Sequence, residues 1–217
     1  MHAWILLAAT TWAPESLPAE SLPDGTVVYL QNSNVFVEAY TKEAVTHVAI
    51  ILNRAGESWL YEAIPGKVRS LPLSKYIDEM RRWNQGRPVK ARMFAAVPAK
   101  EIQQEDIAIL RAFLEAEVGR RYSVRNYVRQ KPGDGVHCAE LLATSLGRIG
   151  RCQIDAPYAA SPGKVIKLLR SDVNPPVEFD IAGTPPEESW WAYIGRQWEE
   201  NTTWCHWACW ETWTFCW

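Results

Sequence analysis

A predicted β-hairpin in the first third of the chain sets the strongest limit on its fold. Residues Thr46–Leu52 (THVAIIL) form a β-branched run of strand length, and Trp59–Ile64 (WLYEAI) is a second apolar run. The segment Asn53–Gly56 (NRAG) between them has hairpin length and contains a glycine, which is typical of a turn between antiparallel strands. We therefore predict an antiparallel strand pair here.

Further predicted elements lie on both sides of this hairpin. Apolar and β-branched composition predicts three more strands, at Thr26–Leu30, Val35–Tyr40 and Val89–Val97. Helical spacing and capping residues predict four helices. They cover Leu73–Trp83, a stripe from Ile107 that stops near Gly119, Cys138–Leu146, and Lys164–Leu169 after an N-cap at Ser161. Strands first, a helical middle and mixed ends indicate an α+β fold with an antiparallel sheet packed against helices.

The two ends of the chain differ from its middle. Residues 14–24 (PESLPAESLPD) are rich in proline, serine and acid and indicate a flexible lead-in. The short apolar run at residues 4–9 resembles an export signal, although only His2 stands where such a signal is positively charged. We assign 1–23 to a flexible lead-in or signal segment, 24–200 to one domain, and 201–217 to a tail outside the fold. The location is left open between cytoplasmic and exported.

The tail is rich in tryptophan and cysteine. Trp204, Trp207, Trp210 and Trp213 are spaced by three residues, a step that drifts around an α-helix and marks no apolar face. Three of the five cysteines also lie here, and an odd count without even spacing predicts no disulfide framework. Cys205, His206 and Cys209 are metal-ligating types, but no second pair stands at zinc-finger spacing, so we predict no metal site.

Charge and hydropathy exclude two classes of partner. The net charge of −2 and the pI of about 6.1 argue against a nucleic-acid-binding protein, which would normally be basic. No apolar run approaches the roughly 20 residues that span a bilayer, so we predict no transmembrane segment.

Cys138 is the candidate nucleophile. It follows a glycine-containing turn, Gly133–Gly135, and opens a predicted helix whose apolar interior should anchor it on the sheet. The N–H groups and positive dipole end at a helix N-terminus lower the pKa of a thiol there, and they form part of an oxyanion site. The alternative is a buried structural cysteine.

His47 is the candidate base, because it begins the best predicted strand. If the hairpin pairs in simple register, Glu62 of the otherwise apolar second strand lies near His47. A carboxylate in an apolar strand is costly unless it is paired, and an imidazole is a suitable partner. His137 is expected to point away from the sulfur, because it is the sequence neighbour of Cys138. The alternative is that His47 is a satisfied core residue.

Four segments together resemble the YiiX/YaeF-like permuted papain-fold amidases, which are relatives of the NlpC-type cell-wall peptidases. The segments are THVAIIL at Thr46–Leu52, YEA at Tyr61–Ala63, GRRY at Gly119–Tyr122 and CAELL at Cys138–Leu142. Papain-like enzymes place Cys before His in the chain, and permuted members reverse that order, as here. The resemblance covers roughly residues 24–170.

The resemblance implies a permuted papain-like (NlpC-type) fold with a catalytic triad of Cys138, His47 and Glu62. It also places Tyr122 near the cleft as a substrate contact. This chain departs from the family pattern in having Ala139 where many members carry a hydroxyl residue after the cysteine, and His137 where several carry an apolar residue before it.

Five basic residues precede the nucleophile, at Arg120, Arg121, Arg125, Arg129 and Lys131. They indicate either capture of a substrate carboxylate or phosphate or a solvated charged face.

The expected activity is cysteine-dependent hydrolysis of an amide or ester bond through an acyl-enzyme. The substrates that fit are a peptide, including cell-wall peptides, an isopeptide or a lipid amide, and no cofactor is implied. Two alternatives stay open. One is a thiol acyltransferase acting on lipid or amine acceptors, and the other is a non-catalytic binding module on the same fold.

Overall fold

A six-stranded sheet forms the centre of the protein in a computed structural model that describes residues 22–85, 87, 89–184, 187–196, 198–199 and 202. The strands are β1 (Val27–Gln31), β2 (Val45–Arg54), β3 (Glu57–Ala63), β4 (Val68–Pro72), β5 (Arg92–Ala96) and β6 (Val177–Phe179). Their order in the sheet is β4-β3-β2-β1-β5-β6, and neighbouring strands pair antiparallel throughout. The predicted α+β class with an antiparallel sheet is confirmed.

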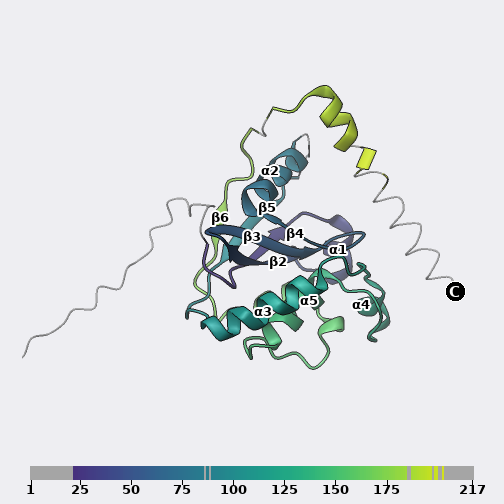
Figure 1. The fold of residues 1–217 in the computed structure, drawn as a ribbon. Coiled ribbons are helices and arrows are strands. Elements are labelled where there is room, and N and C mark those ends of the chain that lie inside the picture. The colour runs from purple at the N-terminus through teal and green to yellow at the C-terminus, as the bar shows by residue number, and fades with distance from the viewer. Residues whose placement is uncertain are drawn as a thin grey trace, which may run out of the picture.

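Helices cover both faces of this sheet (Figure 1). The helical elements are α1 (Val35–Thr41), α2 (Leu73–Asn84), α3 (Gln104–Glu117), α4 (Arg125–Arg129), α5 (Cys138–Gly147), the 3₁₀ turn η1 (Pro157–Ala159) and α6 (Pro162–Leu169). Helix α2 packs on one face, and α3, α5 and α6 pack on the other.

The alternation of side chains along β2 builds both cores at once. Val48, Ile50 and Leu52 point to the α5 side, whereas Ala49 and Ile51 point to the α2 side, because successive strand residues face opposite ways. Both faces of the strand are therefore buried, which explains its almost continuous apolar run.

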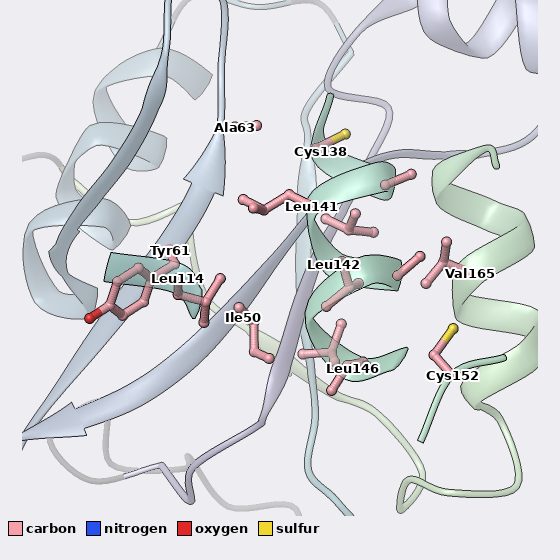
Figure 2. Close-up of a cluster of buried hydrophobic side chains, with 14 of the residues drawn as sticks. Ile50, Tyr61, Ala63, Leu114, Cys138, Leu141, Leu142, Leu146, Cys152 and Val165 are labelled. Atoms are coloured by element: carbon pink, nitrogen blue, oxygen red, sulfur yellow. The ribbon is translucent and has the colours of Figure 1, made fainter. Parts of the chain in front are cut away.

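Helix α5 is anchored by its apolar face. Leu141, Leu142 and Leu146 are at most 2% exposed and project from α5 into the buried cluster (Figure 2). Burying each such side chain stabilises the fold by about 1.5–3 kcal/mol. This packing fixes the axis of α5 and hence the position of Cys138 at its first turn.

The predicted strand at Val35–Tyr40 is wrong, because these residues form helix α1. The Asn34 side chain accepts hydrogen bonds from the N–H groups of Phe36 and Val37 at 3.0 and 3.1 Å, which caps the first turn. No residue of α1 is buried. The β-branched and aromatic residues that suggested a strand therefore have no sheet to pack on, and the local cap decides the conformation.

The other predicted elements exist with shifted ends, and four short named elements were not predicted. These are β4, α4, η1 and β6, of which η1 and β6 have only three residues each, too few for a hydrophobic period to show. Within the described part of the chain, no helix is both long and apolar enough to cross a bilayer. Residues 1–21 and 203–217, with most of the predicted lead-in and almost all of the tail, lie outside the described residues. The flexible lead-in was predicted to reach residue 23, but Leu22 is 1% exposed and belongs to the core on the α2 side.

Candidate active site

His47 lies near the start of β2, directly after an irregularity in the strand pairing. Leu30 pairs with His47 but Gln31 pairs with Val45, so one residue of β2, Thr46, is skipped. The Thr46 hydroxyl lies 2.6 Å from the Ser33 hydroxyl and accepts the Ser33 N–H, which holds the bulge in place. Bulges of this kind re-aim the side chains next to them.

Glu62 lies beside His47 on β3. Tyr61 pairs with Ile50, so the next residue, Glu62, falls on the same face as His47. Its Oε2 is 2.6 Å from His47 Nε2, and the carboxylate is only 1% exposed. The short hairpin turn sets this register. The hydrogen bond between the buried carboxylate and the imidazole gives each group a polar partner.

Arg69 on β4 is a further member of the network that sequence reasoning missed. It pairs directly with Glu62 across the two strands, and its Nε donates to Glu62 Oε1 at 2.7 Å. A second donor of the same guanidinium binds Glu79 of α2 at 2.8 Å. Although burial alone raises the pKa of Glu62, His47 and Arg69 together lower it. Glu62 is thus held ionised between two cations.

Cys138 is the first residue of α5 and is 6% exposed. Burial raises the pKa of the thiol, but hydrogen bonds from His137 and His47 outweigh it and lower the pKa to about 6. For His47, burial lowers the pKa of the ring, while Cys138 and Glu62 raise it to about 10. Between these values a Cys138 thiolate faces a His47 imidazolium. By contrast, burial raises the pKa of the other free cysteine of the described chain, Cys152.

The expectation that His137 points away from Cys138 is wrong. Its side chain folds back over the first turn of α5, where Nδ1 accepts the Glu140 N–H at 3.4 Å, and it interacts with the thiol. His137 is the N-cap residue of α5, and a capping side chain turns toward the first N–H groups of the helix. This explains why its ring lies over the first turn of α5.

The loop before the nucleophile is held by Arg120 and Asn126. Arg120 donates to the carbonyl oxygens of Asp134 and Gly135 at 3.1 and 3.2 Å, and Asn126 Nδ2 donates to the Gly135 oxygen at 2.9 Å. Gly135 fits closely here, since a Cβ on it would lie 2.4 Å from Ser123 Cβ. Arg120 of the basic stretch therefore supports the loop.

Replacing Gly135 by Ala should displace the nucleophile loop. The added methyl group has to push against Ser123 and its backbone nitrogen, so we expect a loss of stability of about 1–3 kcal/mol. We also expect labelling of Cys138 by an acylating probe to slow by about 10- to 100-fold, because small misplacements of reacting groups are costly. Gly195→Ala is the control, since nothing lies within 4 Å of its added Cβ. Equal labelling rates in the two variants would contradict this account of the loop.

Alkylation of Cys138 should show an acid-shifted pH profile. Because the pKa of Cys138 is lowered to about 6, its reaction rate with iodoacetamide should rise through about that pH. An ordinary thiol, with a pKa near 8.5, reacts faster with rising pH between about 7 and 9, whereas Cys138 should already be on its plateau there. Peptide mapping of the alkylated protein measures Cys138 and Cys152 separately. A Cys138 rate that still rises between about pH 7 and 9 would contradict the prediction.

Tyr122, the predicted substrate contact, is 9% exposed and belongs to the core cluster around α5. Its backbone forms a bridge with Val136, two residues before Cys138. Contact with a substrate stays a prediction.

In the described residues, no three His, Cys, Asp or Glu side chains gather closely enough to hold a metal ion. Cys205, His206 and Cys209, the metal-ligating types of the tail, lie outside the described residues.

Comparisons with known proteins find similarity among solved structures. No family model matches the sequence, and no curated protein matches it. Among solved structures, the chain is similar to the crystal structure of the metalloprotein YiiX from Escherichia coli O157:H7. The match has a TM-score of 0.48 and 13% sequence identity, and it covers 74% of this chain and 91% of that one. YiiX is also part of the name of the family that the four sequence segments resemble.

Proposed function

We propose that the chain is a cysteine-dependent hydrolase of permuted papain-like fold that cleaves an amide or ester bond through an acyl-enzyme. One observation carries the proposal, namely that the fully buried Glu62 carboxylate lies 2.6 Å from His47 Nε2 while His47 also interacts with Cys138. This is the arrangement of nucleophile, base and orienting acid.

The reaction begins from the thiolate–imidazolium pair. The Cys138 sulfur attacks the substrate carbonyl carbon, and the oxyanion that forms is stabilised by the N–H groups at the start of α5. His47 then gives its proton to the leaving amine or alcohol as the C–N or C–O bond breaks. In the second half, His47 takes a proton from water and the hydroxide attacks the thioester carbonyl. The C–S bond then breaks, the carboxylic acid forms, and the departing thiolate again faces the His47 imidazolium. Glu62 keeps the imidazole oriented and stabilises its cation throughout.

The cost of the buried charges argues against a purely structural role. Glu62 is removed from water and has an imidazole and a guanidinium as partners, and such buried networks seldom stabilise a fold more than apolar residues of the same volume. A non-catalytic binding module gains nothing from placing this network against a thiol.

Trapping of the acyl-enzyme tests the proposed function directly. The full chain is mixed with an activated p-nitrophenyl ester, and intact-protein and peptide mass spectrometry locate the acyl group. We expect a burst of one p-nitrophenol per protein, an acyl mass on Cys138, and its loss over time as water resolves the thioester. Acylation confined to lysines, or none at all in a folded protein, would overturn the proposal.

Acyl transfer to a lipid or amine acceptor is the second candidate function. It is favoured by the exposed apolar side chains of α1, since Val35 and Phe36 are 69% and 74% exposed. The same helix reaches the site through Tyr40, which packs edge-on against Tyr127, whose ring in turn packs against His137. Adding a long-chain amine to the acyl-enzyme distinguishes the two, because a transferase releases the N-acyl amine faster than the free acid.

A further inference from the structure

His137 is built into the site more firmly than a capping residue requires. Its ring is buried, with 5% of the side chain exposed. Nε2 lies 3.0 Å from the Tyr158 carbonyl oxygen of η1, and since a carbonyl only accepts, Nε2 carries a hydrogen. The Tyr127 ring of α4 meets the imidazole edge-on, with centroids 5.7 Å apart. The ring plane is thus fixed from two other elements.

The remaining ring nitrogen, Nδ1, faces the first turn of α5. There it has two possible partners that exclude one another. As a neutral acceptor it takes the Glu140 N–H, at a distance of 3.4 Å that is long for a hydrogen bond. A protonated ring loses this acceptor and gains a donor for the Cys138 thiolate, the group with which His137 interacts.

The groups around His137 suit a positive ring. From α5, Cys138 and Glu140 face it, and Glu140 Oε2 is 3.8 Å from Nε2. From α4 and η1, Tyr127 and the Tyr158 carbonyl face it. Both charged groups that interact with the ring, the Cys138 thiolate and the Glu140 carboxylate, are negative, so they compensate the charge of an imidazolium. In keeping with this, burial lowers the pKa of His137, but Cys138, the Tyr158 carbonyl and Glu140 outweigh it.

We propose that His137 is a second imidazole partner of Cys138, which stabilises and positions the sulfur as a thiolate independently of His47. The proposal rests on the proposed function in taking Cys138 as the nucleophile. The two histidines then have different roles. His47, held by Glu62, moves protons to and from the reacting groups, whereas His137, held by Tyr158 and Tyr127, keeps the sulfur charged and in place.

The choice of residue at this position is informative. Serine, threonine, aspartate and asparagine are the favoured N-caps, and each would satisfy the Glu140 N–H at least as well as an imidazole. None of them supplies a positive charge to a neighbouring thiolate. The N-cap position alone therefore does not account for a histidine here.

The test compares the pH dependence of Cys138 alkylation by iodoacetamide in three variants of the full chain. His137→Asn keeps a capping side chain and removes the ring charge, His47→Ala removes the other imidazole, and the double variant removes both. We expect the midpoint of the profile to move up by about one pH unit in His137→Asn, and to reach the ordinary thiol range near 8.5 only in the double variant. Cys152 in the same samples reports on global opening.

Two outcomes would overturn the proposal. One is an unchanged midpoint in a folded His137→Asn variant, and the other is an ordinary midpoint in His47→Ala alone. If His137→Asn fails to fold, ¹⁵N chemical shifts of the ring in the wild-type protein decide, since a ring that stays neutral at pH 7 also contradicts it. Alkylation needs no acyl chemistry, so its result is separate from the trapping experiment that tests the hydrolase. If the protein is not acylated but both histidines still lower the pKa of Cys138, only the proposed function is rejected.

Discussion

Replacing Cys138 by Ala is expected to lower the rate of acylation by about 10⁴- to 10⁶-fold, as removal of the nucleophile does in comparable triads. The substitution deletes one sulfur atom at the first turn of α5 and leaves Leu141, Leu142 and Leu146 in the core. The helix should therefore remain in place. Initial rates of p-nitrophenol release from the activated ester measure the effect.

Cys152→Ala is the matched control for this experiment. Cys152 is also a free, buried cysteine, at 4% exposure, and it lies in the same core cluster. Its deletion removes the same atom and creates a comparable small cavity, so any loss of activity through loosened packing appears in both variants. A similar fall in rate for Cys138→Ala and Cys152→Ala would remove the case for a nucleophile.

Glu62→Gln is expected to lower turnover by about 10³- to 10⁴-fold, in line with replacement of the orienting acid in other triads. The amide has nearly the shape of the carboxylate, but it cannot stabilise a His47 imidazolium and it allows the wrong ring tautomer. It also leaves Arg69 with Glu79 as its remaining anionic partner in this network, so some loss of stability is expected as well. The rate of ester hydrolysis and the thermal midpoint are measured on the same samples.

Glu79→Gln separates these two effects. Glu79 binds the same Arg69 guanidinium at 2.8 Å, whereas the Nε2 contact of His47 is with Glu62. This variant should therefore disturb the ion network while preserving turnover to within a few-fold. Nearly unchanged turnover in Glu62→Gln would show that Glu62 is a structural partner only.

Local rules in the sequence determined the two ends of the candidate site. The tight hairpin turn leaves little freedom of register, so His47 and Glu62 are expected on one face of neighbouring strands, and the structure pairs them there. A glycine turn followed by an apolar helix likewise predicts Cys138 at a helix N-terminus, where it stands. Both predictions depend on residues within about 15 positions of each other. Over such short separations, the turn geometry and the regular side-chain directions of strands and helices determine which residues lie together.

Other features of the site and fold were decided by the tertiary structure. Val35–Tyr40 has strand-like residues but finds no sheet partner, so its cap makes it a helix. Arg69 follows Glu62 by only seven residues, but the two became partners through β4, a strand too short to be predicted from its sequence. The ring of His137 is fixed by the Tyr158 carbonyl, 21 residues away. The sequence by itself determined which residue types stand at the turn of a hairpin and at the start of a helix. Only the tertiary structure decided which charges face them, because contacts between distant segments depend on how whole elements pack and leave no periodic pattern in the chain.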